Sequence, residues 1–238
     1  MSDAKASNKM LNALYPFMGT EDGARLVARD KTQQLLAAIQ VKTAESIAAK
    51  QAFFSKYSQT LADIAGTIAS AYARGGRLMT AGNGGSSCDA AHLALEFMHP
   101  VTAGRPALAA INLSQDAAML SAVANDVGFD HVLKRQLLAL AKADDVLVVF
   151  STSGNSSNLI EACRKAGELG MDVVAFSGGD GGELARCESV KHCLIVEIDS
   201  VHRIQECHLV CYHILWDLVH TLLADERGFI GEHGRATE

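Results

Sequence analysis

The stretch VLVVFSTSGNSSNLIEACRKA, residues 146–166, changes character twice along its length. It begins with the apolar run Val146–Phe150, continues through the small polar residues Ser151–Ser157, and ends in a helical pattern. A short run rich in β-branched residues, bounded by polar residues, predicts a buried strand. The stretch is therefore expected to form a strand–loop–helix unit of a parallel sheet, with an unusually polar loop where the strand ends.

Short apolar runs and longer helical patterns alternate on both sides of this unit. Strands are expected at residues 77–81, 107–112, 145–150, 172–176 and 193–198. Helices are expected at residues 86–98, 115–143 with an interruption near 125–129, 158–169 and 203–223. Parallel strands connected by helices form a sheet that is covered on both faces. The sequence thus predicts an α/β fold, a doubly wound five-stranded parallel sheet flanked by helices.

The first 75 residues contain few β-branched residues and are expected to be helical. A helical pattern covers residues 22–50 and continues over residues 52–74, and Gly75-Gly76 ends it. We expect three segments in the chain: an N-terminal helical extension over residues 1–44, the α/β domain over residues 45–224, and a polar tail over residues 225–238.

Composition excludes several classes of function. The chain has 238 residues, of which 49% are apolar, and its 27 acidic and 21 basic residues give a net charge of -6. This balance argues against non-specific nucleic-acid binding. No membrane helix or signal peptide is expected, so the predicted location is the cytoplasm. The six cysteines include no Cys-x-x-Cys pair, so they are expected to be plain thiols, and His208 and His220 are expected in the core.

Two loops at the ends of expected strands are suited to a ligand, the loops Gly82–Ser87 and Ser151–Ser156. Ligands of open parallel sheets lie beyond the carboxyl ends of the strands, and helix N-termini bind anions. Neither loop has the pattern of a nucleotide-binding loop, so no nucleotide cofactor is expected. Ordinary capping by Ser151 or Ser156 would explain one serine but not the whole loop. We favour a phosphate site formed by neutral donors.

Acid–base residues lie within two apolar helices. His92 and Glu96 are four residues apart, and Gln205 and His213 are eight residues apart, so each pair shares one helix face. Polar groups in apolar surroundings are costly to bury unless they are paired or used. A carboxylate and an imidazole facing one pocket can move a proton between carbons. With His92 and Gln205, they could instead or also bind zinc, and the spacing leaves both interpretations open.

Four motifs together resemble the sugar isomerase (SIS) domain over about residues 45–224. They are Gly82-Asn83-Gly84-Gly85-Ser86, Ser151-Thr152-Ser153-Gly154-Asn155-Ser156, Asp180-Gly181-Gly182 and Arg203-Ile204-Gln205-Glu206. Within this family the chain is similar to the phosphoheptose isomerases. These enzymes interconvert sedoheptulose 7-phosphate and D-glycero-D-manno-heptose 7-phosphate, a precursor of surface lipopolysaccharide.

The resemblance implies a role for each matching residue. Glu96 would be the base and His213 the acid of an isomerisation through an enediol. The residues that would bind phosphate are Ser151, Thr152, Ser153 and Ser156. Those that would line the sugar site are Asn83, Gly84, Gly85, Ser86, Asn125, Asp126 and Gln205. In some members of the family, zinc is bound by the residues that match His92, Glu96, Gln205 and His213.

The resemblance also implies a homotetramer with active sites at subunit interfaces, and no nucleic-acid or membrane partner. One related protein binds the bacterial replication initiator but lacks the catalytic Glu and His, which this chain has as Glu96 and His213. Another class fuses the domain to a DNA-binding helix-turn-helix, for which the first 75 residues are not patterned. Two departures leave the exact sugar open. Residues 99–106 contain Arg105-Pro106 but lack the additional arginine that typical enzymes have in a Gly-Arg pair ahead of this segment, and His202 replaces a common Asp.

Overall fold

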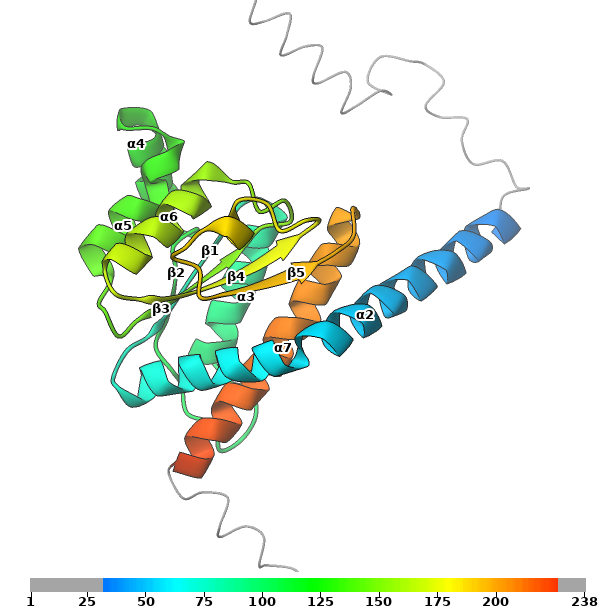
Figure 1. Cartoon of the computed structure of the whole chain (residues 1–238), viewed down its shortest axis with the longest axis horizontal. Coiled ribbons are helices and arrows are strands. Elements are labelled where there is room, and N and C mark those ends of the chain that lie inside the picture. The colour runs from blue at the N-terminus through cyan, green and yellow to red at the C-terminus, as the bar shows by residue number, and fades with distance from the viewer. Residues whose placement is uncertain (1–31, 227–238) are drawn as a thin grey trace, which may run out of the picture. The chain divides into compact units, whose positions relative to one another are not determined.

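The computed structural model describes residues 32–226, which fall into two compact units divided after Glu45. The second unit contains one sheet in which all pairings are parallel and the strand order is β2-β1-β3-β4-β5 (Figure 1). The strands are β1 (Leu78–Gly82), β2 (Ala110–Asn112), β3 (Val146–Phe150), β4 (Asp172–Gly178) and β5 (His192–Val196). The predicted five-stranded parallel sheet is confirmed, with strand ends within three residues of those expected.

Helices connect the strands as the sequence pattern predicts. The elements are α2 (Thr32–Ala73), α3 (Gly85–Met98), α4 (Ala117–Asp126), the 3₁₀ turn η2 (Phe129–His131), α5 (Val132–Leu140), α6 (Ser157–Glu168), the 3₁₀ turn η3 (Leu184–Arg186) and α7 (Val201–Glu226). The expected interruption near residues 125–129 is present between α4 and η2.

The helical pattern expected before Gly75-Gly76 forms one helix, since α2 is continuous from Thr32 to Ala73. Gln51 is a good helix former, and neither Gly nor Pro lies nearby to end a helix. Residues 22–31 of the expected helical segment lie outside the described residues, as does most of the expected tail over 225–238.

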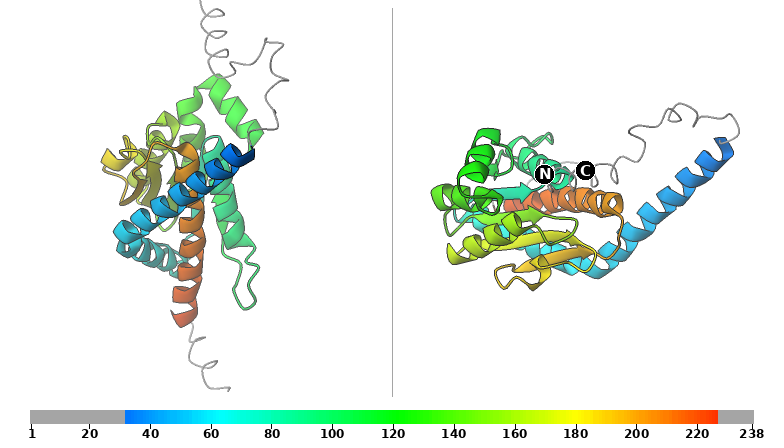
Figure 2. Two further views of the ribbon diagram at one scale, coloured as in Figure 1. Left: turned by 90° about the vertical axis from the view of Figure 1, so that its right-hand side faces the viewer. Right: turned by 90° about the horizontal axis from the view of Figure 1, so that it is seen from above.

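Strand residues alternate between two cores, one on each face of the sheet. Val148 of β3 packs on the face covered by α2, α3 and α7, and its neighbour Val149 packs on the face covered by α5 and α6. Successive strand residues point to opposite faces, so a strand covered on both sides is apolar throughout. All five residues of β1 and of β3 are buried accordingly. The two layers of helices are visible in Figure 1 and Figure 2.

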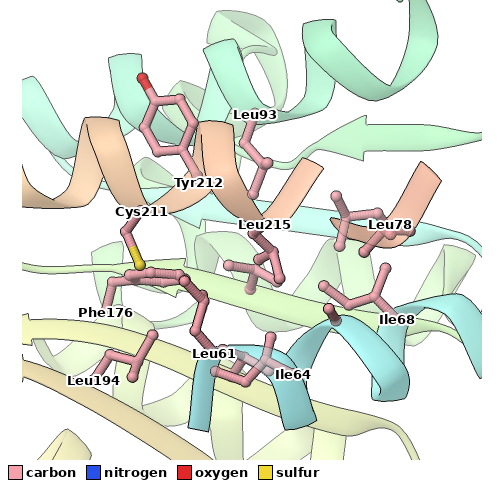
Figure 3. Close-up of a cluster of buried hydrophobic side chains, with 14 of the residues drawn as sticks. Leu61, Ile64, Ile68, Leu78, Leu93, Phe176, Leu194, Cys211, Tyr212 and Leu215 are labelled. Carbon is pink, nitrogen blue, oxygen red and sulfur yellow. The ribbon is translucent and has the colours of Figure 1, made fainter. Parts of the chain in front are cut away.

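Helix α7 belongs to the core despite its composition. It is long and apolar enough to cross a membrane, judged by length and hydropathy alone. However, Cys207, Cys211 and Leu215 are fully buried against the sheet, and Cys211 and Leu215 lie in the cluster shown in Figure 3. We therefore interpret α7 as a helix of the core, and its two cysteines as the buried thiols expected.

His208 and His220, the two buried histidines of α7, are core residues, as predicted. The Nε2–H of His208 donates to the carbonyl of Ser177 at 3.1 Å, and burial lowers the pKa of this imidazole to about 4. His220 packs between Phe97 and Trp216, with ring-centroid distances of 5.9 and 5.0 Å. Both imidazoles are therefore structural.

The strand register places the two ligand-type loops side by side. Gly82, the last residue of β1, pairs with Phe150, the last residue of β3. The chain continues from these residues into the loops Gly82–Ser87 and Ser151–Ser156, and then into α3 and α6. Two helix N-termini therefore begin at the same edge of the sheet, which is where open parallel sheets bind ligands.

Candidate active site

The loop Ser151–Ser156 is held in shape by its own backbone and side chains. The Ser151 N–H donates to the carbonyl of Phe176 at 2.9 Å, which continues the pairing of β3 with β4. The Ser151 hydroxyl accepts from the Gly154 N–H at 3.0 Å, and the Ser153 hydroxyl accepts from the Asn155 N–H at 3.2 Å. Gly154 adopts φ +67°, a conformation that other residues rarely adopt.

The segment after β4 supports this loop from one side. The Gly154 carbonyl accepts from Leu184 N–H, and the Asn155 side chain accepts from Glu183 N–H, each at 3.0 Å. A Cβ atom on Gly154 would lie 2.0 Å from the carbonyl oxygen of Gly181. The motif Asp180-Gly181-Gly182 thus serves as a close-packed support for the serine-rich loop.

The helices that follow the two loops begin without a side-chain cap. Ser156 is the N-cap residue of α6, and its side chain makes no capping hydrogen bond. Gly84, the N-cap residue of α3, has no side chain that could make one. By contrast, the Asp116 side chain caps α4 by accepting from Met119 N–H at 2.9 Å. Ordinary capping therefore does not account for the serines of the loop. Uncapped helix N-termini at the edge of a sheet are suited to an anion such as phosphate.

The loop Gly82–Ser87, the glycine loop, lies against the beginning of α7. A Cβ atom on Gly85 would lie 2.4 Å from Nε2 of Gln205, so the Gln205 amide packs directly on the backbone of this loop. Gly84 adopts φ +52° and Ser86 is buried. A cavity of about 140 Å³ opens beside the loop, lined by Gly82, Asn83, Gly84, Ser87, Ser114, Leu120, Phe129, Leu133 and Asn158. The loop Gly82–Ser87 therefore borders an open cavity.

Three of the predicted acid–base residues meet between α3 and α7. The potential ligand atoms of His92, Glu96 and His213 all lie within 4.8 Å of one another. His92 Nε2 is 3.1 Å from Glu96 Oε1, and its Nδ1 is 2.9 Å from the hydroxyl of Tyr212. Since a carboxylate only accepts, Nε2–H donates to Glu96 and Nδ1 accepts from Tyr212. The two helices thus orient a carboxylate and two imidazoles around one point.

This acid–base cluster is open to solvent in the single chain. The His92 and Glu96 side chains are 39% and 22% exposed, and His213 is exposed. Although its segment of α7 is apolar, His213 is not buried among apolar side chains. Partial desolvation and the neighbouring His92 lower the pKa of His213, while Glu96 opposes this shift. A neutral imidazole beside a carboxylate can transfer protons near neutral pH.

The donor set of the cluster fits a zinc ion. Two imidazoles and a carboxylate are typical zinc ligands, and catalytic zinc has three protein ligands and an open position. Metal-bound histidines are normally hydrogen-bonded through their other ring nitrogen, which for His92 is the role of Tyr212. The structure places the amide of Gln205, the fourth predicted ligand, against Gly85 at the start of α3.

Comparison with known proteins identifies the family. Residues 41–178 match the SIS domain. The phosphoheptose isomerase of Aquifex aeolicus is 39% identical over 181 residues, which are 76% of this chain and 94% of that protein. The chain belongs to the SIS domain family. Its phosphoheptose isomerase branch also includes a relative from Solidesulfovibrio magneticus that is 41% identical over 175 residues, 74% of this chain and 84% of that protein.

Solved structures agree with this assignment of the SIS domain. The phosphoheptose isomerase of Neisseria gonorrhoeae is 38% identical, with a TM-score of 0.73, and the match covers 79% of this chain and 99% of that one. The enzyme of Francisella tularensis is 34% identical, with a TM-score of 0.74, and the match covers 78% and 98% of the two chains. The fold and the order of motifs are therefore those of the phosphoheptose isomerases.

Three residues of this SIS domain site were not singled out from the sequence. Tyr212 bonds His92, and the Trp216 indole N–H donates to the Glu96 carbonyl at 2.8 Å. Asp89 lies one turn before His92, and burial raises its pKa to about 6 although His92 lowers it. Trp216 is three residues beyond His213 on α7, so helical spacing from that residue could have indicated it. No such spacing indicates Tyr212, which directly precedes His213.

Two predicted sugar-site residues do not line the cavity beside the glycine loop. Asn125 and Asp126 are exposed at the end of α4, where the Asn125 amide donates to the Asp126 carboxylate at 2.9 Å. Leu120 and Phe129, from the same region of the SIS domain, do line the cavity beside Asn83. The assignment of Asn125 and Asp126 to the sugar site stays a prediction.

Proposed function

We propose that this protein is a phosphoheptose isomerase that converts sedoheptulose 7-phosphate to D-glycero-D-manno-heptose 7-phosphate. One observation above all supports the proposal: His92 and Glu96 lie on α3, the helix that starts at the glycine loop, and meet His213 of α7 in one cluster. His92 is seven residues beyond Gly85, so it lies about 10 Å along α3 from that loop. A sugar phosphate can span this distance, with phosphate at the loops and its reacting carbons at the cluster.

The loop Ser151–Ser156 would bind the phosphate through neutral donors. The backbone N–H groups at the start of α6 and the hydroxyls of Thr152 and Ser156 are suited to phosphate oxygens. The rigid support from Gly181 and Leu184 keeps the loop in one conformation before the ligand arrives. Binding energy from the phosphate can then position the far end of the sugar for reaction.

Glu96 and His213 would catalyse the proton transfers. Glu96 removes a proton from C1 of the ketose, next to the carbonyl at C2, while His213 gives a proton to the carbonyl oxygen. The product of this step is an enediol. Return of the proton from Glu96 to C2, with loss of the hydroxyl proton at C1 to His213, forms the aldose and restores both residues. No atom is gained or lost in the overall reaction.

Zinc is proposed as a cofactor of this site, held by His92, Glu96, Gln205 and His213. A bound zinc ion would polarise the substrate carbonyl and stabilise negative charge on its oxygen. Glu96 has two carboxylate oxygens, so one can serve as a ligand while the other accepts the proton. The Tyr212 hydroxyl would hold the His92 ring in the orientation that either role requires.

We propose a cytoplasmic homotetramer with active sites at subunit interfaces. The acid–base cluster is partly exposed, and apolar side chains lie exposed on the same two helices, Leu95 and Met98 on α3 and Leu209 and Ile214 on α7. A second copy of the chain covering this surface would bury them and exclude water from the cluster. Water exclusion strengthens the electrostatic interactions of an active site.

The test is an assay with sedoheptulose 7-phosphate that follows formation of the aldose phosphate, with added zinc and after chelation. We expect turnover with zinc and its loss on chelation, restored when zinc is returned. Turnover that survives chelation would assign His92 and Gln205 to the substrate rather than to zinc. Turnover only with another sugar phosphate would change the substrate, and its absence with all of them would favour a binding role, such as capture of the replication initiator.

A further inference from the structure

A reciprocal amide pair joins the two ligand loops. The Asn83 Nδ2 donates to Asn158 Oδ1 at 2.8 Å, and the Asn158 Nδ2 donates to Asn83 Oδ1 at 2.9 Å. Asn83 follows the last residue of β1, and Asn158 is the second residue of α6. The two residues are 75 positions apart in sequence, and they meet because β1 and β3 are neighbours in the sheet.

The pair lies where the phosphate loop (Ser151–Ser156) approaches the sugar loop (Gly82–Ser87, the glycine loop). Asn83 directly precedes Gly84 and Gly85. Asn158 is the second residue of α6, which begins at Ser157 immediately after the loop Ser151–Ser156. Both residues line the cavity of about 140 Å³ beside the glycine loop. A change in their separation would therefore change the distance between the phosphate site and the reacting carbons.

A contact in both directions needs a donor and an acceptor on each side chain, which two amides provide. Each side chain has to donate through nitrogen and accept through oxygen at the same time. Asn158 is 2% exposed, so a group left unpaired there has no water to replace its partner. A further link of the same kind exists one strand away, where the Ser114 hydroxyl donates to the Gly82 carbonyl at 2.8 Å and accepts from the Gly82 N–H at 3.1 Å.

We propose that Asn158 is a positioning residue, which sets the sugar loop relative to the phosphate loop through its amide pair with Asn83. This inference rests on the proposed function, because it assigns the two loops to the two ends of one substrate. Asn158 acts through Asn83 and the backbone of Gly84 and Gly85. The phosphate loop keeps its own shape without the pair, since its hydrogen bonds are internal or come from residues 176–184.

The test replaces Asn158 by Ala and by Asp in the full-length chain and measures kcat, KM and inhibition by inorganic phosphate. For Asn158→Ala we expect kcat/KM to fall by roughly 10- to 100-fold, since a misplacement of about 1 Å can cost that much. Inhibition by inorganic phosphate should stay within about twofold, because that ligand needs the phosphate loop alone. Equal losses for sugar phosphate and inorganic phosphate would overturn the proposal.

Asn158→Asp provides a readout that a merely structural role would not change. Its ionised carboxylate cannot donate to Asn83 Oδ1, whereas the protonated acid can donate and accept like the original amide. The ratio of its kcat/KM to that of the parent should therefore rise as the pH is lowered. A ratio that stays constant with pH, together with a parent-like kcat/KM for Asn158→Ala, would exclude the positioning role.

A double-mutant cycle with Asn83→Ala and Asn158→Ala completes the test. If Asn158 acts through Asn83, the double variant should be about as impaired as the worse single variant, and additive losses would contradict this. Turnover by the parent protein is measured in the same experiment. Its absence would refute the proposed function, whereas parental turnover unaffected by the Asn158 variants would refute only this inference.

Discussion

The serine-rich loop and the acid–base cluster differ in how far a single chain completes them. The loop Ser151–Ser156 is fixed by hydrogen bonds from β4 and from residues 181–184, and Ser151 is buried. In the cluster, His92 bonds Glu96 and the Tyr212 hydroxyl, and the Glu96 carbonyl accepts from Trp216, yet all three side chains of the cluster are partly or largely exposed. One part of the site is rigid on its own, and the other is exposed.

This difference follows from where each part is attached. The loop follows the central strand β3, and the bond from Ser151 N–H to Phe176 of β4 continues the strand pairing into it. The cluster lies on the helices α3 and α7, and its side chains remain partly or largely exposed there. Under the proposed function, phosphate would bind to a loop that one chain holds in shape, whereas the cluster would be completed by the neighbouring subunit that is proposed to cover it.

The largest expected effect separates catalysis from phosphate binding. Glu96→Gln removes the base but keeps the shape of the side chain, so kcat should fall by about 10²- to 10⁴-fold. Inhibition by inorganic phosphate should be unchanged, because the serine-rich loop is intact. Steady-state kinetics with inorganic phosphate as inhibitor measures both quantities.

The matched control is Glu168→Gln, an exposed glutamate on α6 whose side chain is 63% exposed. This variant should have the parental kcat. If Glu96→Gln folds, assembles like the parent and turns over at the parental rate, Glu96 is not the base.

Rigidity of the serine-rich loop is tested by Gly154→Ala. The positive φ alone costs about 1–3 kcal/mol of folding free energy, and the new Cβ would also lie 2.0 Å from the Gly181 carbonyl oxygen. Each kcal/mol lowers Tm by roughly 2–4 °C in a chain of this size. Thermal unfolding should show the loss, and inorganic phosphate should inhibit the variant less.

Gly179→Ala isolates the contact from the strain. Gly179 has φ +64°, similar to Gly154, but no atom lies within 4 Å of its expected Cβ. Its Tm should therefore fall less than that of Gly154→Ala. Equal Tm values for the two variants would show that the support from Gly181 contributes nothing.

Acid pH should destabilise the core beneath the serine-rich loop. His208 bonds the carbonyl of Ser177, whose hydroxyl donates to the Gly181 carbonyl. Burial lowers the pKa of His208 from 6.5 to about 4, so the unfolded chain binds the proton more readily than the folded chain. The free energy of unfolding should fall by about 3 kcal/mol as pH decreases through this range.

Denaturant unfolding as a function of pH measures this effect. His208→Gln keeps a hydrogen-bond donor but does not titrate, so its stability should depend less on pH over the same range. His99→Gln, at an exposed position, is the control and should retain the parental pH dependence. Identical pH dependence in the parent and His208→Gln would assign the acid sensitivity to other groups.

The smallest expected effect concerns the orientation of His92. Tyr212→Phe removes the hydroxyl that bonds Nδ1 of His92, and a hydrogen bond of this kind contributes about 1 kcal/mol, or roughly a fivefold change in rate. We expect kcat to fall by about that factor, with weaker retention of zinc during chelation. Kinetics and zinc titration measure the two effects.

Tyr72→Phe is the matched control for this variant. The Tyr72 hydroxyl donates to the carbonyl of Ala109 at 3.0 Å, outside the acid–base cluster. It should lose stability of similar size without loss of kcat. If both variants keep the parental kcat and zinc affinity, the Tyr212 hydroxyl does not position His92.

Local sequence patterns predicted most of the fold because they act over short distances. The β-branched runs gave five buried strands, and their order β2-β1-β3-β4-β5 is one that doubly wound sheets commonly have. The helical pattern over residues 22–50 and 52–74 forms one continuous helix where the structure describes it, from Thr32 to Ala73, with no break at Gln51. Helix breaks need a residue that breaks them, and none is present there.

The sequence by itself determined the strand–loop–helix units, the uncharged phosphate-type loop, and the pairing of His92 with Glu96 on one helix face. These features depend on residues within a few positions of each other. Only the tertiary structure decided which distant residues meet, as Asn83 does with Asn158 and His92 with Tyr212. It also decided that His213 is exposed. The reason is physical: strand order and helix packing bring these groups together, and no local pattern specifies either.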